Sequence, residues 1–462
     1  MTLAFTYLAI TVGVLLTASA VIWVLQQRRS PQSALAWILF IVTAPYVGVP
    51  LFFALGIRKR GTLYEYLEFA PDPETPLPAA ATPDTPHHPL DDMFRRLDLP
   101  AAETGHRLAL ETDPKSARLS LERLVGEADT SLDIVLYRLD PDPFTAAFMT
   151  AVTEAVGRGV RVRMILDHLG TIIKRPRPAL AAFVAAGGEL RMFSPFPKFL
   201  ATGRLNLRNH RKMVIADGRR VWSGGRNIGI TYLGEPSDPA TWHDLSFTLE
   251  GPMVQRYGEV FEADWLKEGE PAALPPAPTA PIPGGETLAQ LVPSGPDLPH
   301  DGLHDALVHA VHTARDRVWI ATPYFLPSDQ LLHALGTAAR LGRDVRLLVP
   351  ARSNQRVTDF ARGAYLRDLE EAGVRVLRYG PRMMHAKAVV LDDAAIIGSA
   401  NIDVRSMLLN FETALFLYDP ASVAELADWY TRLAATASIG TRPVTLARRL
   451  AEATFRLGAP IL

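Results

Sequence analysis

The distribution of apolar residues separates an N-terminal apolar region from two longer regions of mixed pattern. Leu3 to Leu25 is almost continuously apolar and carries no charge, and a second apolar run extends from Ala34 to Leu55. A helix rises about 1.5 Å per residue, so the first run is long enough to cross a hydrocarbon layer about 30 Å thick. The two runs predict an N-terminal transmembrane helical hairpin at residues 1–60.

The second apolar run contains Pro45, Gly48 and Pro50, which would kink a spanning helix or mark a re-entrant hairpin. A buried core hairpin is the alternative, but two such uncharged runs in succession are rare in soluble domains. Basic residues flank the second run on both sides, with the slightly larger cluster at Arg58–Arg60. This bias favours a multi-pass protein of the cell membrane whose remaining chain is cytoplasmic.

Two proline-rich stretches divide the rest of the chain. The first includes Pro71 to Pro89 within a linker at 61–104, and the second is a linker at 268–284. Such composition is typical of extended spacers without a packed core. The stretches delimit a first lobe at 105–267 and a second lobe at 285–436, followed by a C-terminal amphipathic helix within 437–462.

The two lobes repeat one order of elements. In the first lobe, the apolar pattern predicts helices at 117–128, 144–158 and 178–186, and strands at 132–137, 161–166 and 190–193. In the second lobe, it predicts helices at 303–314, 329–340 and 365–372, and strands at 317–321, 344–349 and 375–378. Alternating strands and helices predict an α/β fold with mainly parallel sheets.

The C-terminal segment Thr445–Leu457 places Leu446, Leu450 and Leu457 on one helical face, with arginines elsewhere. Such a helix either lies on a bilayer surface or docks against a lobe, and we expect docking.

Composition narrows the function classes. Apolar residues make up 48% of the 462 residues, which is enough for two buried cores. The net charge of −1 gives no global basic field of the kind that binds nucleic acid. The chain has no cysteine, which excludes disulfides, thiol nucleophiles and thiolate metal sites.

In each lobe, a short histidine-containing strand and then a second strand are predicted after the elements above, and a short motif occurs once on each such pair. The first copy contains His210, Lys212 and Asp217, followed by Gly224-Gly225-Arg226-Asn227. The second copy contains His385, Lys387 and Asp392, followed by Gly398-Ser399-Ala400-Asn401. On a strand, side chains alternate between faces, so the histidine and lysine of each copy are expected on one face.

These residue types suit phosphoryl chemistry. An imidazole can attack phosphorus or protonate a leaving oxygen, and an ammonium can hold a phosphate oxygen. We expect Asn227, Asn401 and Ser399 to bind the same phosphate. A single His-x-Lys pair could arise by chance on a solvated strand, but two matched copies argue against chance. The lysines can supply positive charge, so no metal and no cofactor are expected.

The pattern H-x-K-x4-D followed by G-[GS]-x-N, present twice, resembles the signature of the phospholipase D superfamily. The flanking stretches Trp242-His243-Asp244, Thr322-Pro323-Tyr324 and Asn401-Ile402-Asp403 are similar to its cardiolipin synthase branch. Two features depart from the pattern: Gly225 stands where many members have serine, and the connection after Asp392 is one residue shorter than its counterpart after Asp217.

The resemblance implies two duplicated lobes packed face to face around a shared site. It implies transfer of a phosphatidyl group between two phosphatidylglycerol molecules through a phosphatidyl-histidine, with release of glycerol. His210 is then the nucleophile and His385 the acid/base, although the sequence itself is nearly symmetric. The motif aspartates Asp217 and Asp392 belong to the catalytic signature, but we expect them to brace the hairpin.

A buried carboxylate is expected to orient each imidazole. Asp244 and Glu412 follow the histidines of their own lobes at similar distances and are the candidates. Pairing with a nearby arginine is the alternative. Tyr137 and Tyr324 occupy matching strand ends, where they either line the cleft or pack in the core.

Several functions remain open. Water as acceptor would make the protein a phospholipase D, and another alcohol would make it a different phosphatidyltransferase. The membrane hairpin and the near-neutral charge argue against a nuclease. The complete His/Lys/Asn sets in both lobes argue against a non-catalytic membrane scaffold. The expected partners are phosphatidylglycerol, other anionic phospholipids and the bilayer, with no nucleic acid and with oligomerisation open. The run Lys174–Arg177 and the arginines from Arg204 to Arg220 either contact lipid headgroups or form solvated faces.

Overall fold

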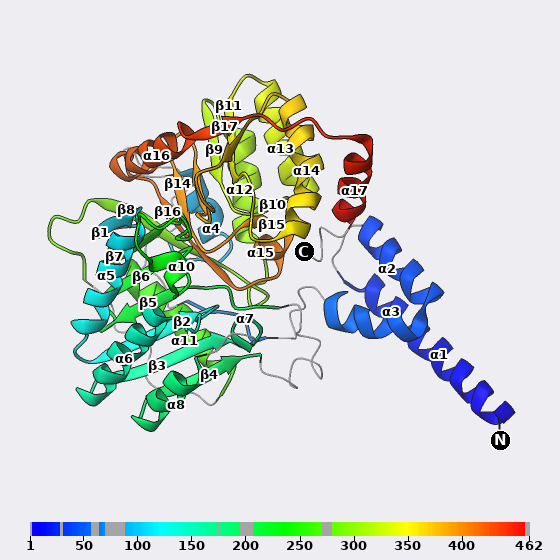
Figure 1. Cartoon of the computed structure of the whole chain (residues 1–462), viewed down its shortest axis with the longest axis horizontal. Coiled ribbons are helices and arrows are strands. Elements are labelled where there is room, and N and C mark those ends of the chain that lie inside the picture. The colour runs from blue at the N-terminus through cyan, green and yellow to red at the C-terminus, as the bar shows by residue number, and fades with distance from the viewer. Residues whose placement is uncertain are drawn as a thin grey trace.

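The computed structural model describes residues 2–27, 31–56, 64–69, 88–172, 176–194, 207–269 and 280–457. Figure 1 shows a body of two α/β lobes with the N-terminal helices extending from one side. The basic residues at 28–29, 58–60, 174–175 and 204, and most of both proline-rich stretches, lie outside the described residues.

The N-terminal region contains one helix of spanning length. Helix α1 (Thr2–Leu25) includes the apolar span Ala4–Leu25, the one span in the described part of the chain that is long and apolar enough to cross a membrane. The second apolar run forms α2 (Pro31–Thr43), α3 (Pro45–Leu51) and a short π-helix (Phe52–Gly56). The predicted hairpin of two spanning helices is therefore wrong.

The break in the second run lies at Ala44, whose backbone (φ −140°, ψ 66°) leaves the helical region immediately before Pro45. A residue before proline is sterically disfavoured from helical geometry, which explains the position of the break. At Gly48, an added Cβ would lie 2.9 Å from both the Cα of Ile41 and the carbonyl oxygen of Phe40. Glycine therefore allows α3 to fold back closely against α2.

The lobes form one 15-stranded mixed sheet. Its order is β17-β12-β11-β9-β13-β14-β16-β8-β1-β7-β6-β5-β2-β3-β4. The strands of the first lobe are β1 (Glu103–Glu111), β2 (Ser131–Leu136), β3 (Arg161–Asp167), β4 (Glu189–Phe193), β5 (Met213–Ala216), β6 (Arg220–Gly224) and β7 (Ser246–Glu250). Those of the second are β8 (Thr287–Ser294), β9 (Arg317–Ala321), β11 (Asp344–Pro350), β12 (Arg375–Tyr379), β13 (Ala388–Val390), β14 (Ala395–Gly398), β16 (Glu412–Leu417) and β17 (Ala437–Ile439).

The strand order confirms the internal duplication. Read outward from the centre, the first lobe runs β1-β7-β6-β5-β2-β3-β4, and the second runs β8-β16-β14-β13-β9-β11-β12 before the additional β17. Each strand of one series has its counterpart at the same place in the other. The repeat seen in the sequence is therefore a repeat of topology.

Two features of the predicted architecture are wrong. Only β2–β3–β4 and β9–β11–β12 pair in parallel within the described sheet, and its other pairs are antiparallel. The two sheets also join edge to edge through antiparallel pairing of β1 with β8, rather than stacking face to face. The two short strands predicted at and after each motif are present as β5–β6 and β13–β14, but the prediction missed the antiparallel strands β1, β7, β8 and β16.

Helices cover the sheet. In the first lobe these are α5 (Pro114–Gly126), α6 (Pro143–Gly157), α7 (His168–Ile172), α8 (Arg177–Ala185), α10 (Ile230–Leu233) and α11 (Met253–Leu266). In the second they are α12 (Gly302–Thr313), α13 (Asp329–Arg340), α14 (Arg356–Glu371), α15 (Val404–Leu408) and α16 (Pro420–Ala434). A separate two-stranded sheet pairs β10 (Phe325–Leu326) with β15 (Ile402–Asp403) in parallel. Helix α14 begins nine residues earlier than the sequence pattern predicted.

The first proline-rich linker is partly ordered. Within it, α4 (Pro89–Arg95) buries Phe94 completely, and the ring of Tyr64 packs against Phe193 and Phe411. Residues 64–69 and 88–104 therefore belong to the folded body, contrary to the prediction of a spacer across 61–104. At the other end, α17 (Leu446–Leu457) docks on α14, as expected.

Candidate active site

Each motif histidine lies in an extended segment just before a strand, not within the strand as predicted. His210 precedes β5, and His385 precedes β13. The residue before each histidine forms a parallel bridge to the opposite lobe: Asn209 pairs with Phe411, and Met384 pairs with His243. The amide of His210 donates to the carbonyl of Phe411 at 2.9 Å, and the amide of His385 donates to the carbonyl of His243.

These reciprocal bridges decide which carboxylate meets which imidazole. Because Glu412 follows Phe411, its Oε1 and Oε2 lie 2.9 and 3.0 Å from Nδ1 of His210. Because Asp244 follows His243, its Oδ2 lies 2.6 Å from Nδ1 of His385. Each imidazole therefore contacts the carboxylate of the other lobe, and not the one that follows it in its own lobe.

The two imidazoles line one cavity. This cavity of about 370 Å³ is lined by His210 and His385 together with Asn227, Asn401 and polar residues of both lobes. With Nδ1 protonated and donating to a carboxylate, each imidazole keeps a lone pair on Nε2, and Nε2 of His385 lies 3.2 Å from Nζ of Lys387. The arrangement places two potential nucleophiles or proton carriers at a single site.

Aromatic rings hold the imidazoles in place. The ring of Tyr137 lies 4.9 Å from that of His210, and the rings of Tyr232 and Trp242 each lie 5.4 Å from that of His385. Tyr137 and Tyr324 also line the cavity. Of the two positions expected for these tyrosines, in the cleft or packed in the core, the structure shows the cleft. Tyr232 was missed by sequence reasoning because it lies on the short α10, outside any motif.

Both lysines are buried next to their histidines. The Nζ of Lys212 donates to the carbonyl of His210 at 2.7 Å, and the Nζ of Lys387 donates to the carbonyl of His385. Burial lowers the pKa of Lys212 to about 7 and that of Lys387 to about 8, although nearby carboxylates oppose the shift. Neither lysine is among the residues that line the cavity, and an ammonium has three donors, so each Nζ has donors beyond this carbonyl contact.

The histidines also titrate abnormally. Burial lowers the pKa of His210, against the opposing effect of the Glu412 carboxylate. Burial and the neighbouring Lys387 ammonium lower the pKa of His385 to about 3, although Asp244 opposes the shift. The Nδ1 of His385 lies within hydrogen-bond distance of both Asp244 and Lys387. In the neutral ring, Nδ1 either donates its proton to Asp244 or offers a lone pair to the Lys387 ammonium, but not both. We assign the proton to Nδ1, where it is donated to the Asp244 carboxylate.

The motif asparagines line the cavity, but the motif serine does not. The side-chain amides of Asn227 and Asn401 each have a buried Oδ1 without a hydrogen-bond partner. The oxygen and nitrogen of such an amide are assigned rather than observed, so the same position can present an N–H to an anion. The Oγ of Ser399 instead donates to Oε2 of Glu412 at 2.5 Å. In this structure Ser399 therefore contacts the carboxylate that orients His210, and it does not line the cavity where a phosphate contact was predicted.

The position equivalent to Ser399 in the first lobe is Gly225. An added Cβ there would lie 2.3 Å from Oδ1 of Asp244, far inside van der Waals contact. This explains why the first motif lacks a hydroxyl at this position.

The motif aspartates lie at the other end of β5 and β13 from the histidines. Oδ1 of Asp217 accepts from the amides of Thr130 and Ser131 at 2.7 and 3.0 Å. Asp392 accepts from the amides of Arg315 and Arg317 at 2.6 and 2.8 Å. Each aspartate ties its hairpin to the start of the neighbouring strand, β2 or β9, and neither lines the cavity.

The residue between His210 and Lys212 points away from the cavity into a buried network. Arg211 is fully buried, and its Nη1 contacts Oδ1 of Asp264 at 2.5 Å. Asp264 also accepts from the side chain of Asn209 at 2.8 Å. This network fixes the backbone beneath His210. In the described part of the chain, no group of three or more potential metal ligands lies close together.

Comparison with known proteins gives consistent matches. Residues 121–265 and 307–434 match the family model described as "Cardiolipin synthase, PLD-like domain", and residues 15–56 match "Phospholipase_D-nuclease N-terminal". The chain is 30% identical over 473 residues to cardiolipin synthase A of Yersinia pseudotuberculosis serotype O:1b (strain IP 31758), with 97% of this chain and 96% of the relative covered. It is 29% identical over 475 residues to cardiolipin synthase A of Edwardsiella ictaluri (strain 93-146), with the same coverage.

A solved structure has the same fold. The crystal structure of phosphatidylserine synthase from Haemophilus influenzae Rd KW20 superposes with a TM-score of 0.64. The match covers 81% of this chain and 100% of that chain at 13% sequence identity. At this identity, the likeness establishes the two-lobed fold alone.

Proposed function

The chain belongs to the cardiolipin synthase family of the phospholipase D superfamily, and we propose from this that it joins two phosphatidylglycerol molecules into cardiolipin and releases glycerol. It is a phospholipase-D-type phosphatidyltransferase. The observation that carries the proposal is the single cavity lined by His210 and His385, each backed by a carboxylate of the opposite lobe.

In the first step, Nε2 of His210 attacks the phosphorus of phosphatidylglycerol. The bond between phosphorus and the glycerol oxygen breaks, and the departing oxygen takes a proton from Nε2 of His385. For this step His385 is protonated on both ring nitrogens, a form that Asp244 and the bound anionic phosphodiester stabilise. Glu412 stabilises the positive charge that develops on the His210 ring, because its carboxylate accepts the hydrogen bond from Nδ1–H. The products of this step are free glycerol and a phosphatidyl group bonded to His210.

In the second step, a glycerol hydroxyl of another phosphatidylglycerol attacks the same phosphorus. His385 takes the hydroxyl proton, the bond between phosphorus and His210 breaks, and cardiolipin leaves. Lys212, Lys387, Asn227 and Asn401 hold the non-bridging oxygens, where the transferring group carries its charge. Both steps use the same residues, with His385 acting first as acid and then as base.

The proposed substrate is a lipid, and the N-terminal region supports its delivery. Helix α1 anchors the enzyme in the cell membrane, with α2 and α3 packed against it rather than crossing separately. The basic cluster at 58–60 favours a cytoplasmic location for the two lobes. The catalytic cavity would then draw its substrate from the adjacent leaflet.

The decisive experiment follows the lipid products. Purified full-length enzyme in mixed micelles with phosphatidylglycerol is expected to release glycerol and cardiolipin in equal amounts. The His210→Ala variant is expected to form neither product. Phosphatidic acid as the main product would identify water as the acceptor and contradict the proposal, and transfer to an added alcohol in preference to phosphatidylglycerol would contradict it equally.

The nucleophile is identified with a substrate whose leaving group needs no proton. Phosphatidyl-p-nitrophenol fits this purpose, because p-nitrophenolate leaves unassisted near neutral pH. The His385→Ala variant is expected to release one equivalent in a burst and to retain the phosphatidyl group. The His210→Ala variant is expected to release none, and a burst from that variant instead would exchange the two roles.

A further inference from the structure

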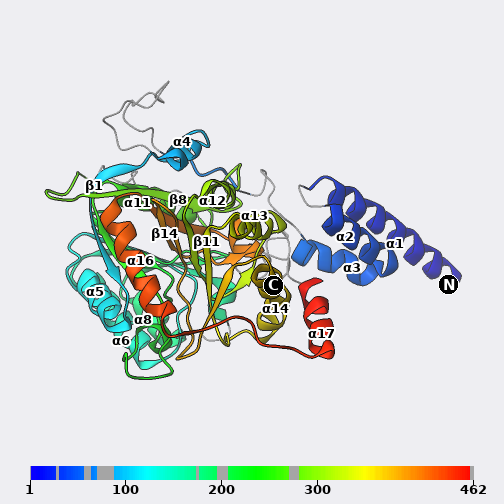
Figure 2. The ribbon, with the colours of Figure 1, turned by 90° about the horizontal axis from the view of Figure 1, so that it is seen from above.

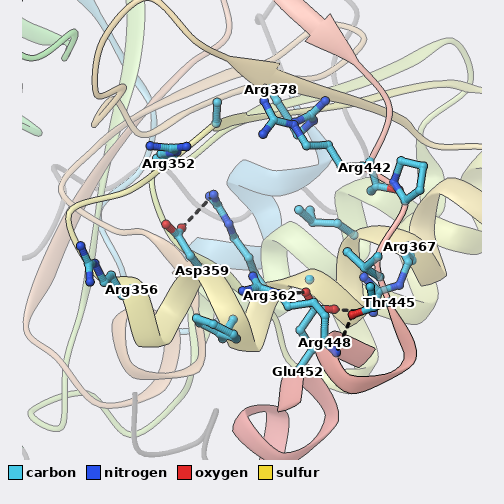
Figure 3. Close-up of a pocket in the computed structure, with 17 residues that line it drawn as sticks. Arg352, Arg356, Asp359, Arg362, Arg367, Arg378, Arg442, Thr445, Arg448 and Glu452 are labelled. Atoms are coloured by element: carbon cyan, nitrogen blue, oxygen red, sulfur yellow. Dashed lines mark hydrogen bonds and ion pairs between the residues drawn. The ribbon is translucent and has the colours of Figure 1, made fainter. Parts of the chain in front are cut away.

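A second cavity, of about 560 Å³, lies between α14, the segment 441–445 and α17 (Figure 3). It shares no lining residue with the catalytic cavity. Helix α14 separates the two: Gln355 and Thr358 line the catalytic cavity, whereas Arg356, Asp359 and Arg362 line the second. The second cavity is therefore a distinct site that borders the catalytic one through a single helix.

The second cavity is strongly basic. Seven of its lining residues are arginines, and two, Asp359 and Glu452, are acidic. This excess of positive charge is local, because the whole chain has a net charge of −1. Figure 3 shows Arg378 and Arg442 on the side of the cavity opposite to α14, so that positive groups face it from two sides.

The two acidic residues are already engaged. Asp359 contacts Arg362 at 2.8 Å, and Glu452 contacts Arg367 at 2.5 Å and Arg448 at 2.7 Å. Other carboxylates nearby are also used: Glu370 accepts from the amide of Thr441 at 3.0 Å. Arg352, Arg356 and Arg442 are exposed and make no ion pair that involves the described residues. The cavity therefore lacks the negative charge that would balance it.

One buried donor marks the cavity as incomplete. The side chain of Arg362 is only 5% exposed, and its Nη2 donates to the carbonyl of Pro350 at 2.7 Å. Its Nη1 is buried without a hydrogen-bond partner. A buried, unsatisfied guanidinium donor is costly, and an anion in the cavity would remove that cost.

The helix beside the cavity indicates where the anion comes from. Helix α17 packs on α14 through Arg448, whose guanidinium lies 3.5 Å from the centre of the Phe360 ring, and through Arg456, which contacts Asp368 at 2.8 Å. This docking leaves Leu446 and Leu450 exposed at 72% and 62%. Apolar side chains next to arginines are typical of a surface that meets anionic lipid. Figures 1 and 2 both show α17 on the side of the body from which the N-terminal helices extend.

We propose that the cavity between α14 and α17 is a second phospholipid site, which binds the phosphate of an anionic headgroup while Leu446 and Leu450 contact its acyl region. An arginine guanidinium can donate two parallel hydrogen bonds to the two non-bridging oxygens of a phosphodiester. The absence of free carboxylates in the cavity favours an anion over a zwitterionic headgroup. A lipid bound in this second cavity would contact one side of α14, whose other side borders the catalytic cavity.

Native mass spectrometry of the full-length protein in a neutral detergent tests the proposal. The His385→Ala background prevents turnover, so binding is measured independently of the proposed reaction. Arg352→Gln/Arg442→Gln removes two exposed charges from the cavity, and Arg219→Gln/Arg340→Gln removes two exposed charges elsewhere as the matched control. The probes are phosphatidylglycerol, phosphatidylcholine and inorganic phosphate.

The cavity variant is expected to bind one phosphatidylglycerol fewer, with an affinity for that lipid reduced roughly 30-fold for two lost charges. The control variant is expected to bind phosphatidylglycerol as the parent does. All three proteins are expected to bind phosphatidylcholine equally. Equal phosphatidylglycerol binding by all three proteins would overturn the proposal. So would a loss confined to inorganic phosphate, which would indicate a free anion rather than a lipid. Should the first variant melt at a lower temperature than its parent, Arg356→Gln/Arg442→Gln repeats the comparison.

Discussion

Glu412 in the second lobe contacts His210 in the first, with its two carboxylate oxygens 2.9 and 3.0 Å from the imidazole Nδ1. The reverse contact joins Asp244 to His385 at 2.6 Å. Each histidine is therefore carried by one lobe and oriented by the other. Each lobe has an imidazole, a carboxylate and a lysine, but neither lobe alone pairs its imidazole with a carboxylate.

Glu412→Gln tests the orienting role. The amide keeps the shape of the side chain but removes the charge that stabilises the imidazolium, so kcat is expected to fall at least about 100-fold. The KM for phosphatidylglycerol is expected to change little, since the carboxylate does not line the cavity. Initial rates of cardiolipin formation in mixed micelles measure both quantities.

The matched control is Ser399→Ala, which removes only the hydroxyl that donates to Glu412 at 2.5 Å. It is expected to reduce kcat by a smaller factor, about tenfold. An unaltered kcat in Glu412→Gln would show that the contact is structural and would reject the orienting role.

Gly225→Ala should displace the other carboxylate. The new Cβ would lie 2.3 Å from Oδ1 of Asp244, so the carboxylate must move from its position beside His385. We expect a loss of about 10- to 100-fold in kcat while the protein remains folded. The control is Gly126→Ala, where an added Cβ meets nothing within 4 Å. Equal activity of the two variants in the lipid assay would contradict the steric argument.

Alkaline pH should weaken substrate binding. The pKa of Lys212 is lowered to about 7 and that of Lys387 to about 8 by burial, and only the protonated form of a lysine carries charge. As pH rises through this range, the free enzyme loses its phosphate-binding charge, so kcat/KM falls. Bound phosphate raises both pKa values, so kcat is expected to decline only at higher pH.

Rate measurements at saturating and at low phosphatidylglycerol, across about pH 6 to 10, separate the two profiles. In Lys212→Arg, the alkaline limb of kcat/KM should move upward, because a guanidinium stays charged throughout this range. A value of kcat/KM that stays constant to pH 10 in the parent enzyme would rule out this role of the lysines.

Asp217→Ala should affect stability rather than chemistry. The carboxylate accepts from the amides of Thr130 and Ser131 at the start of β2, and the residue itself has a positive φ of 55°. Losing these hydrogen bonds is expected to cost about 1–3 kcal/mol in the free energy of unfolding. Thermal melting measures the loss, and kcat at a permissive temperature should remain within about twofold of the parent.

Asp217→Asn is the milder comparison, because asparagine keeps one acceptor oxygen and tolerates positive φ. A large drop in kcat for a variant of Asp217 that melts like the parent would place this residue in the chemistry instead.

Sequence reasoning succeeded where a signal was local and periodic. The predicted strands at 317–321 and 344–349, and the helix at 329–340, agree with β9, β11 and α13 within one residue. It failed where a signal was weak or depended on distant residues. The missed strands β8 and β16 are almost wholly buried, so they lack the alternation that identifies a strand. The order of strands within the sheet could not be derived from their order along the chain.

The duplication, the residue types of both motifs and the apolar N-terminal segment could be read from the sequence alone, because each of these is a property of neighbours along the chain. Only the tertiary structure decided that Glu412 faces His210 and Asp244 faces His385. The reason is physical: the bridges Asn209–Phe411 and Met384–His243 form between segments far apart in the chain. They exist only once the two lobes have joined through β1 and β8.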